Sequence, residues 1–316
     1  MIHTHRLPDG VYAASLTPQH DDLSVDHERL VAHGRWLLDN GCDGIVLFGT
    51  TGEANSFTVA ERMAALDAVV DAGIPAHRLL VGTGCCAVPD TVTLTRHAVE
   101  HGAGGVLVLP PFYYKNVPDD GIFAAFDQVI QQVGEARLQV YLYHFPQMST
   151  VPFSDAVIER LLSAYPDTIV GMKDSTGDWM HMKHVVEAFP GFRVFSGTEQ
   201  YLLDILEVGG AGCISATVNI TCPLAGDIFA RWQSEDMRPL QHRLVAIRVA
   251  ITVYPVIPAL KRIIAEQTRQ ADWLNLRPPL TPLADNEVAA LLRIFATADS
   301  RCNRRFTQIK ATADSR

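Results

Sequence analysis

Short apolar segments alternate with longer helical patterns along most of the chain, and this alternation constrains the fold more than any other feature of the sequence. Most of the apolar segments are nearly continuous runs rich in β-branched residues, a pattern typical of parallel strands buried on both faces. The eight candidate strands are Val11–Leu16, Gly44–Phe48, Leu79–Gly82, Gly105–Leu109, Gln139–Tyr143, Ile169–Lys173, Arg193–Ser196 and Gly212–Ile214.

Helical periodicity separates these strands, and several of the helices begin and end with recognisable signals. Thr58 and Glu61 have the spacing of a capping box, and a glycine follows many of the helical segments before the next strand begins. The expected helices are Val25–Asn40, Thr58–Ala72, Asp90–His101, Asp119–Val133, Ser154–Tyr165, Trp179–Phe189, Glu199–Val208 and Cys222–Trp232.

Eight successive strand–helix units fit either a closed (β/α)8 TIM barrel or an open, doubly wound sheet. No Gly-x-Gly-x-x-Gly motif follows the first strand, which weakens the dinucleotide-binding version, and the number of units favours the barrel. After about residue 233 the pattern is helical only, mainly over Pro239–Thr268 and Asn286–Thr297. We therefore predict an α/β protein with an active-site barrel over residues 1–233 and a C-terminal helical extension over 234–316.

Charge and composition exclude several classes of protein. The net charge is −9, with 35 acidic and 26 basic residues, whereas nucleic-acid-binding proteins usually carry a basic excess. The six cysteines lack C-x-x-C spacing, so we expect reduced thiols rather than disulfides. Residues 1–10 have no apolar segment typical of a signal peptide, and Arg248 interrupts the apolar stretch 244–260. We expect a cytoplasmic protein that binds neither nucleic acid nor membranes.

A lysine ends the sixth apolar run, where residues 169–177 read Ile-Val-Gly-Met-Lys-Asp-Ser-Thr-Gly. Active sites of such barrels lie at the C-terminal ends of the strands. Burying an ammonium group is costly, so Lys173 is expected to lose its proton readily. A neutral amine in a dry pocket is the nucleophile that a Schiff-base enzyme needs. The alternative is a lysine that extends to the rim or pairs with Asp174.

Two other strand ends carry polar groups. Period-two alternation puts Tyr141 and Tyr143 on one face of the fifth strand, where a hydroxyl could relay protons, although both could equally be core aromatics. The second strand is followed by Gly49-Thr50-Thr51-Gly52, a turn whose hydroxyls and N–H groups could hold a carboxylate. A plain tight turn is the alternative.

Metal and cofactor sites are not evident in the sequence. His181 and His184 are three residues apart on an expected helix, a spacing that zinc accepts, but a third ligand is not apparent. Because a lysine alone can carry out covalent catalysis, we predict neither a metal nor an organic cofactor. A metal-dependent aldolase remains an alternative.

Several short motifs occur in a fixed order along the chain. They are Gly49-Thr-Thr-Gly-Glu53, Tyr113-Tyr114, Tyr143 with Pro146, Gly171-Met-Lys-Asp-Ser-Thr-Gly177, Ser196-Gly197, Ile214-Ser-Ala-Thr-Val-Asn219, Pro258-Ala-Leu-Lys261 and Arg277-Pro-Pro-Leu-Thr-Pro282. Together they resemble the motifs of the dihydrodipicolinate synthase / N-acetylneuraminate lyase family, from about residue 10 to about residue 295.

The resemblance implies a barrel and a class I aldolase mechanism. Lys173 matches the Schiff-base lysine of the family, and Tyr143 matches the tyrosine that shuttles protons beside it. Thr50 and Thr51, next to Gly49, match the residues that hold the keto-acid carboxylate and pass protons on.

The resemblance also implies an assembly of several subunits. Tyr114 matches a tyrosine that is lent by the adjacent subunit, so a homo-oligomer, either a dimer or a tetramer, is expected. Gly197 and Ile214 match backbone sites that flank the bound substrate.

This sequence differs from the family pattern at two positions, and the identity of the second substrate therefore stays undetermined. In the synthases an arginine that grips the second substrate's carboxylate occupies the position of Met148, and methionine cannot form a bidentate contact with a carboxylate. His144 replaces a common asparagine, and we expect both side chains to line the variable side of the pocket.

The implied reaction is aldol cleavage or condensation of pyruvate, or another 2-keto acid, with an aldehyde, as in 2-keto-3-deoxy sugar acid aldolases. Dehydration of a keto-deoxy acid would use the same intermediate. Met148 disfavours 4-hydroxy-tetrahydrodipicolinate synthase activity, and a non-catalytic barrel that binds keto acids is the alternative from another class.

Overall fold

The computed structural model describes residues 7–298, and within them eight parallel strands close into one barrel. Each strand pairs with the next in the sequence, and β8 pairs with β1. The predicted (β/α)8 barrel is therefore confirmed. The strands are β1 Gly10–Ala14, β2 Gly44–Leu47, β3 Leu79–Gly82, β4 Gly105–Val108, β5 Val140–His144, β6 Ile169–Asp174, β7 Arg193–Ser196 and β8 Gly212–Ser215.

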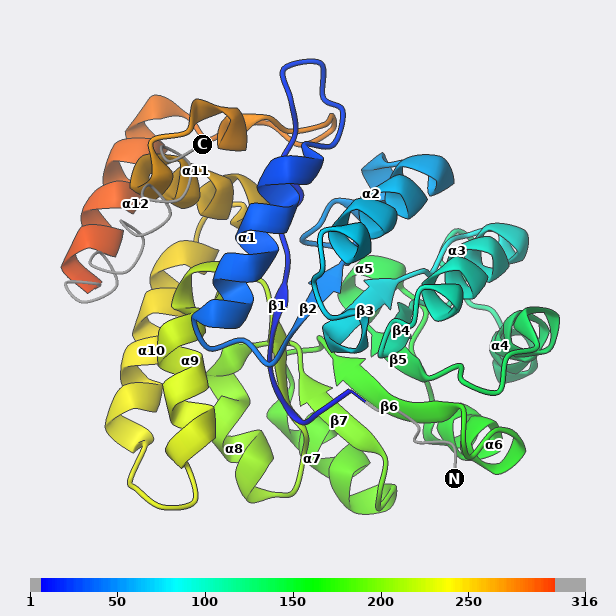
Figure 1. The fold of residues 1–316 in the computed structure, drawn as a ribbon. Coiled ribbons are helices and arrows are strands. Elements are labelled where there is room, and N and C mark those ends of the chain that lie inside the picture. The colour runs from blue at the N-terminus through cyan, green and yellow to red at the C-terminus, as the bar shows by residue number, and fades with distance from the viewer. Residues whose placement is uncertain (1–6, 299–316) are drawn as a thin grey trace.

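Helices surround the sheet and cover its outer face (Figure 1). A short helix, α5 Pro146–Ser149, follows β5 before the main helix of that unit. The helices of the eight units are α1 His27–Asp39, α2 Val59–Asp71, α3 Val88–Glu100, α4 Asp119–Val133, α6 Asp155–Ala164, α7 Trp179–Ala188, α8 Leu202–Glu207 and α9 Val218–Arg231.

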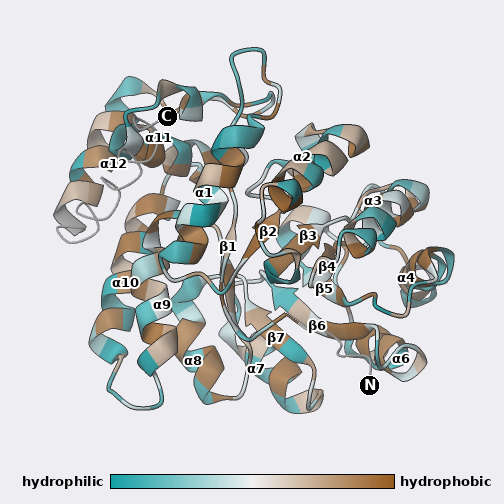
Figure 2. Ribbon diagram, viewed as in Figure 1, coloured by the Kyte–Doolittle hydropathy of each residue, from teal (hydrophilic) through white to brown (hydrophobic). Residues whose placement is uncertain are grey.

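The core has two layers, one inside the barrel and one between the strands and the helices. Figure 2 shows hydrophobic residues concentrated on the strands and on the inward faces of the helices. Inside the barrel, the rings of Tyr12 and Tyr141 both pack edge-to-face against Phe195. Gly44 and Gly171 leave room for these rings, since a Cβ added there would lie 2.2 Å and 2.7 Å from ring carbons. This aromatic layer fills the barrel one level below the strand ends.

Three further helices form the C-terminal part of the described chain: α10 Arg238–Thr252, α11 Val256–Thr268 and α12 Asp285–Ala298. They gather beside α1 and α9 in Figure 1. The segment Pro239–Thr268, predicted as one piece, is divided into two helices at Pro255, whose ring disfavours helical backbone in the residue before it. Residues 299–316 of the predicted extension lie outside the described part.

No single helix among the described residues is long and apolar enough to cross a membrane. The helices α10 and α11 meet the length and composition criteria only as a pair, which is bent by 107°.

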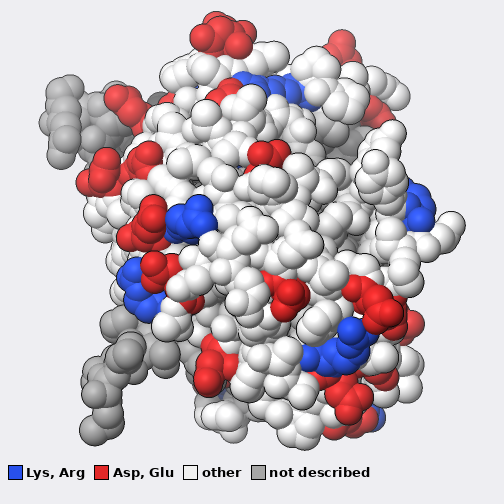
Figure 3. Space-filling view, turned by 90° about the vertical axis from the view of Figure 1, so that its right-hand side faces the viewer, with Lys and Arg blue, Asp and Glu red and all other residues white. Residues whose placement is uncertain are grey.

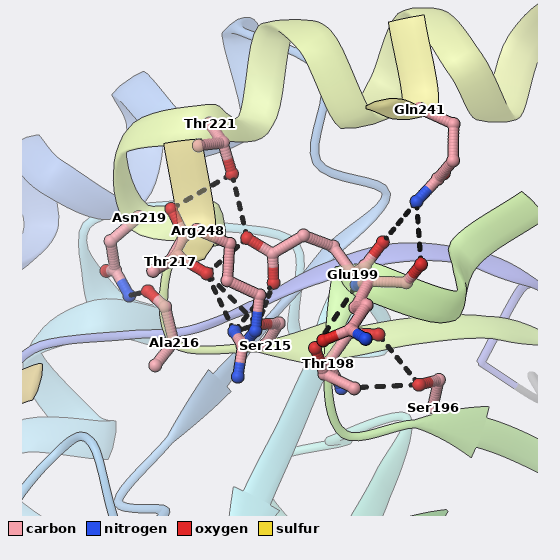
Figure 4. Close-up of polar contacts among 11 residues, drawn as sticks. Ser196, Thr198, Glu199, Ser215, Ala216, Thr217, Asn219, Thr221, Gln241 and Arg248 are labelled. Atoms are coloured by element: carbon pink, nitrogen blue, oxygen red, sulfur yellow. Dashed lines mark hydrogen bonds and ion pairs between the residues drawn. The ribbon is translucent and has the colours of Figure 1, made fainter. Parts of the chain in front are cut away.

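Buried polar contacts attach α10 to the ends of β7 and β8 (Figure 4). The Arg248 guanidinium donates to Glu199 Oε2 at 3.0 Å, to Ser215 Oγ at 3.0 Å and to Thr217 Oγ1 at 2.9 Å. Both hydroxyls in turn donate to the Glu199 carboxylate, which is fully buried. Gln241, also on α10, donates to the Glu199 backbone carbonyl at 2.9 Å. The contacts of this one carboxylate thus join the barrel to α10.

Candidate active site

Lys173 and Tyr143 lie side by side at the C-terminal ends of β6 and β5. The strand register pairs these two residues directly, and alternation along each strand turns both side chains into the barrel. The Lys173 Nζ donates to the Tyr143 hydroxyl at 3.2 Å and lies 4.4 Å from the centre of that ring. The phenol oxygen is also 3.2 Å from Thr50 Oγ1. An amine, a phenol and an alcohol therefore form one hydrogen-bonded line across the mouth of the barrel.

The Lys173 amine is buried without a counter-ion. The residue is only 4% exposed, so it does not extend to the rim. The neighbouring Asp174 points to the other face of β6, where it accepts hydrogen bonds from the Thr176 N–H at 2.9 Å and from His181 Nδ1 at 2.6 Å. Among the described residues, no carboxylate lies within ion-pair distance of Lys173. Neither alternative to a reactive lysine, extension to the rim or pairing with Asp174, is therefore observed.

The turn after β2 is held in a fixed shape beside this line. Backbone hydrogen bonds run from Glu53 N to Thr50 O at 3.1 Å and from Ala54 N to Gly49 O at 3.3 Å, and Thr51 is buried. Within the described chain, the N–H groups of Thr50 and Thr51 donate to no protein acceptor. The turn therefore presents two backbone donors next to the Thr50 hydroxyl.

Glu53, which ends this turn, has a left-handed backbone with φ of 56°. Its buried carboxylate accepts a hydrogen bond from Lys261 Nζ of α11 at 2.5 Å and from Gln19 Nε2 at 3.1 Å. Burial lowers the pKa of Lys261, and the carboxylate of Glu53 opposes that shift. The ion pair fastens the turn to the C-terminal helices, a role that its position in the motif did not reveal.

Two residues expected to flank the substrate lie on β8 and directly after β7. Ile214 of β8 is fully buried in the same interior cluster as Tyr143. Gly197 follows β7, and its N–H donates to the Asp174 carbonyl at 2.6 Å. A Cβ on Gly197 would lie 2.3 Å from Ser175 Oγ, so the two chain segments can approach this closely only with glycine there.

Two other predicted residues are exposed instead of facing Lys173. Tyr114 is 74% exposed and contacts the ring of Tyr113, with 5.3 Å between ring centres. Met148 on α5 is 59% exposed. Within a single chain neither side chain contributes to the hydrogen-bonded line at Lys173.

His144 lies behind the site, because alternation along β5 turns it away from Tyr143. Its ring stacks on His181 of α7 with 4.7 Å between centres, and its Nδ1 accepts a hydrogen bond from the Phe153 N–H at 3.2 Å. Burial lowers the pKa of His144 to about 4, whereas the hydrogen bond to Asp174 raises the pKa of His181. The structure therefore does not bring His144 to the lysine, although we expected it in the pocket.

The histidine pair considered as a zinc site does not converge. His181 bonds to Asp174, while His184 Nε2 lies 2.7 Å from Asp155. On the face drawn in Figure 3, basic and acidic side chains are interspersed and no extended basic patch forms. A different group of possible metal ligands, on α2 and α3, lies outside the barrel and is described below.

Comparison with known proteins gives a family match over nearly the whole described chain. Residues 7–298 match the Dihydrodipicolinate synthetase family. An "uncharacterized DapA-like lyase" of Chloroflexus aurantiacus is 38% identical over 290 residues, which are 90% of this chain and 95% of that protein. A 4-hydroxy-tetrahydrodipicolinate synthase of Acidiphilium cryptum is 31% identical, over 77% of this chain and 82% of its own.

Solved structures share the fold over a similar length. The dihydrodipicolinate synthase of Agrobacterium tumefaciens superposes with a TM-score of 0.85 and 31% identity, covering 92% of this chain and 99% of its own. YagE, an E. coli prophage protein of the dihydrodipicolinic acid synthase family, solved in complex with pyruvate, gives a TM-score of 0.83 and 26% identity. That alignment covers 92% of this chain and 98% of YagE.

Proposed function

This chain belongs to the dihydrodipicolinate synthetase family and is a lyase, and from that premise we propose that Lys173 forms a Schiff base with pyruvate or another 2-keto acid. One observation carries the proposal. The amine is buried without a counter-ion and lies 3.2 Å from the Tyr143 hydroxyl. Such an amine can act as a nucleophile, and the phenol beside it can move the protons that carbinolamine formation and dehydration require.

The proposed steps use only groups of the protein and the two substrates. The Lys173 amine attacks the C2 carbonyl, and the carbinolamine loses water as Tyr143 delivers a proton to the departing hydroxyl. Tyr143, now deprotonated, takes the proton of the C4 hydroxyl as the C3–C4 bond breaks. The iminium accepts the electron pair of that bond, which releases an aldehyde and leaves an enamine. Protonation at C3 and hydrolysis then release the keto acid and the free lysine, and condensation runs the same steps in reverse.

The turn after β2 is the proposed site for the keto-acid carboxylate. The free N–H groups of Thr50 and Thr51 support this assignment, since backbone donors in a turn bind anions well. The hydroxyl of Thr50, 3.2 Å from the phenol oxygen, would carry protons between Tyr143 and the substrate. Gly197 and Ile214 would border the bound chain of the substrate.

We propose that the partner substrate is an aldehyde of the kind released from 2-keto-3-deoxy sugar acids, and dehydration of such acids is the second candidate. Met148 supports this choice over 4-hydroxy-tetrahydrodipicolinate synthesis, because a thioether offers no charged donor for a second carboxylate. The pyruvate bound in the structure of YagE supports a 2-keto acid as the first substrate.

We propose a homo-oligomer of two or four subunits acting in the cytoplasm. The pair of exposed tyrosines supports this, since Tyr113 and Tyr114 are 72% and 74% exposed and large exposed aromatics are enriched at interfaces. In the assembly, Tyr114 would enter the site of the neighbouring subunit.

Borohydride trapping tests the Schiff base. The protein is incubated with pyruvate and sodium borohydride, and the reduced adduct is mapped by mass spectrometry of peptides. We expect one adduct per chain at Lys173 and none in Lys173→Met. Lys183→Met, which removes a partly exposed lysine on α7, is the matched control. Pyruvate binding without any adduct would favour the non-catalytic barrel, and an adduct at another lysine would refute the assignment of Lys173.

A panel of aldehydes and 2-keto-3-deoxy acids then identifies the reaction. Pyruvate release or consumption marks aldol chemistry, and loss of water without pyruvate release marks dehydration. Activity that survives strong chelators excludes the metal-dependent aldolase, whereas activity that chelators abolish would refute a mechanism based on lysine alone.

A further inference from the structure

Three possible metal ligands converge on the outer surface of the barrel, between α2 and α3. Asp67 Oδ1 lies 2.8 Å from His97 Nε2 and 3.1 Å from His101 Nε2. All three ligand atoms lie within 4.8 Å of one another. The histidines are four residues apart, so they share one face of α3, and α2 supplies the carboxylate.

The contacts are not those of ordinary hydrogen bonds between histidine and aspartate. Asp67 Oδ1 is shielded from solvent, yet it accepts no hydrogen bond from the described residues, because neither ring directs an N–H at it. The two ring nitrogens and this oxygen are close enough together to share one cation. Ligands of one tetrahedral metal ion, each about 2.0–2.2 Å from it, are about 3.3–3.6 Å apart, so the Asp67 carboxylate would move back by a few tenths of an ångström to admit the ion.

The other contact of the His101 ring favours metal binding. His101 Nδ1 lies 2.9 Å from the His97 carbonyl, and donation of that N–H leaves Nε2 with a free lone pair, as is usual for metal-bound histidines. His97 Nε2 also lies 3.5 Å from the Met63 carbonyl, at the limit of a hydrogen bond. Because a carbonyl only accepts, metal binding at Nε2 replaces this weak contact and puts the ring proton on Nδ1.

The position in the fold also suits a cation. His97 is in the last turn of α3, and His101 is its C-cap, where the helix dipole favours positive charge. The His97 side chain is 9% exposed, that of His101 31% and that of Asp67 44%, so one side of the cluster faces solvent. The two helices run back from the mouth, which puts their C-terminal ends at the end of the barrel opposite Lys173.

We propose that Asp67, His97 and His101 bind one divalent ion of the zinc class, with water completing its coordination, and that this ion clamps α2 to α3. Two imidazoles and one carboxylate suit zinc, cobalt or nickel rather than magnesium or calcium, which prefer oxygen ligands. Because the cluster lies away from the barrel mouth, the ion would stabilise the fold without entering the reaction.

Metal titration of the full chain, without a purification tag, tests the site. Zinc binding is followed by calorimetry, and cobalt binding by its visible absorption, which reports the coordination geometry. We expect one ion per chain and a rise in melting temperature on adding zinc. In His101→Ala, and in the near-isosteric Asp67→Asn, affinity falls at least about tenfold and the thermal shift disappears, while lyase activity is unchanged.

Two controls separate this site from incidental histidines. His184→Ala removes a histidine that faces a single carboxylate, and His3→Ala with His5→Ala removes the imidazoles closest to the N-terminus. Neither change alters binding if the proposal holds. Unchanged affinity in both His101→Ala and Asp67→Asn, or loss of binding on removing His3 and His5, overturns it.

Discussion

At the scale of single residues, Tyr143 is the centre of the site, since its hydroxyl lies 3.2 Å from both Lys173 Nζ and Thr50 Oγ1. Tyr143→Phe keeps the ring but removes the proton carrier. We expect turnover to fall by about 10²–10⁴-fold, with slower but detectable borohydride trapping at Lys173. Steady-state kinetics and trapping rates measure the two effects separately.

Tyr141→Phe is the matched control for Tyr143→Phe. The Tyr141 hydroxyl lies one level deeper in the barrel and accepts a hydrogen bond from Arg193 at 2.7 Å. Its loss should lower stability without reducing turnover by more than a few-fold. Equal losses of turnover in the two variants would show that Tyr143 only supports packing.

His144 makes the stability of the folded chain depend on pH. Its pKa is about 4 in the folded protein, against about 6.5 in the unfolded chain. Protonation of His144 therefore favours unfolding. The contribution of the neutral ring to the free energy of unfolding is complete above about pH 6.5 and is lost as pH falls toward about 4. In His144→Asn, the fall in the free energy of unfolding between pH 7 and pH 4 should shrink by roughly 3 kcal/mol.

Urea denaturation at several pH values measures this effect. His33, also buried with a pKa of about 4, should maintain part of the acid dependence in the variant. The ring of His181 stacks on His144, and its hydrogen bond to Asp174 raises the pKa of His181, so His181→Gln serves as the comparison. An identical pH dependence in His144→Asn and the unmodified chain would contradict the prediction.

At the scale of elements, the Glu199 carboxylate is one of the groups that attach α10 to the barrel. Arg248→Met would leave Glu199 without its cationic partner, and an unpaired buried charge is strongly unfavourable. Because the Arg248 side chain is 20% exposed, we expect a loss of roughly 2–4 kcal/mol in the free energy of unfolding. Adding Glu199→Gln to Arg248→Met should restore much of the lost free energy of unfolding, because the buried charge is then gone. Urea denaturation of the single and double variants measures this. If the losses of the two substitutions simply added, Arg248 and Glu199 would not be coupled.

The sequence predicted the elements well because each strand carries its own burial signal. All eight predicted strands form, and Leu79–Gly82 and Arg193–Ser196 have the predicted bounds. The predicted start of α9 was wrong. A helix beginning at Cys222 was expected, because this places Pro223 near the first position of the helix, where proline is favoured. The helix begins at Val218 and contains Pro223, so the boundary is set by the end of β8 rather than by proline.

Contacts between elements explain what the sequence did not reveal about the site. Motif and strand alternation were enough to bring Lys173, Tyr143 and Thr50 together. The same alternation predicts that His144, the residue after Tyr143 on β5, faces away from the barrel interior. The pairs Glu53–Lys261 and Glu199–Arg248 join residues 208 and 49 positions apart, and no local pattern signals such pairings.

At the scale of the whole molecule, a site that borrows Tyr114 would be complete only in an oligomer. Tyr114 is 74% exposed in the single chain, and a symmetric dimer could exchange this residue between its two sites. Lys173→Met and Tyr114→Phe homo-oligomers should each be nearly inactive. In a hybrid dimer, however, one site combines Lys173 of one subunit with Tyr114 of its partner.

Mixing the two inactive proteins after mild dissociation should therefore restore activity. Random pairing makes half of the dimers hybrid, each with one complete site of two, so recovery approaches roughly a quarter of the unmodified activity. Mixing without dissociation is the control and should restore little. If Tyr114 acted within its own chain, every site in the mixture would lack either the lysine or the tyrosine hydroxyl, and no activity would return. Restored activity would therefore locate the tyrosine in the neighbouring subunit, whichever substrate is used in the assay.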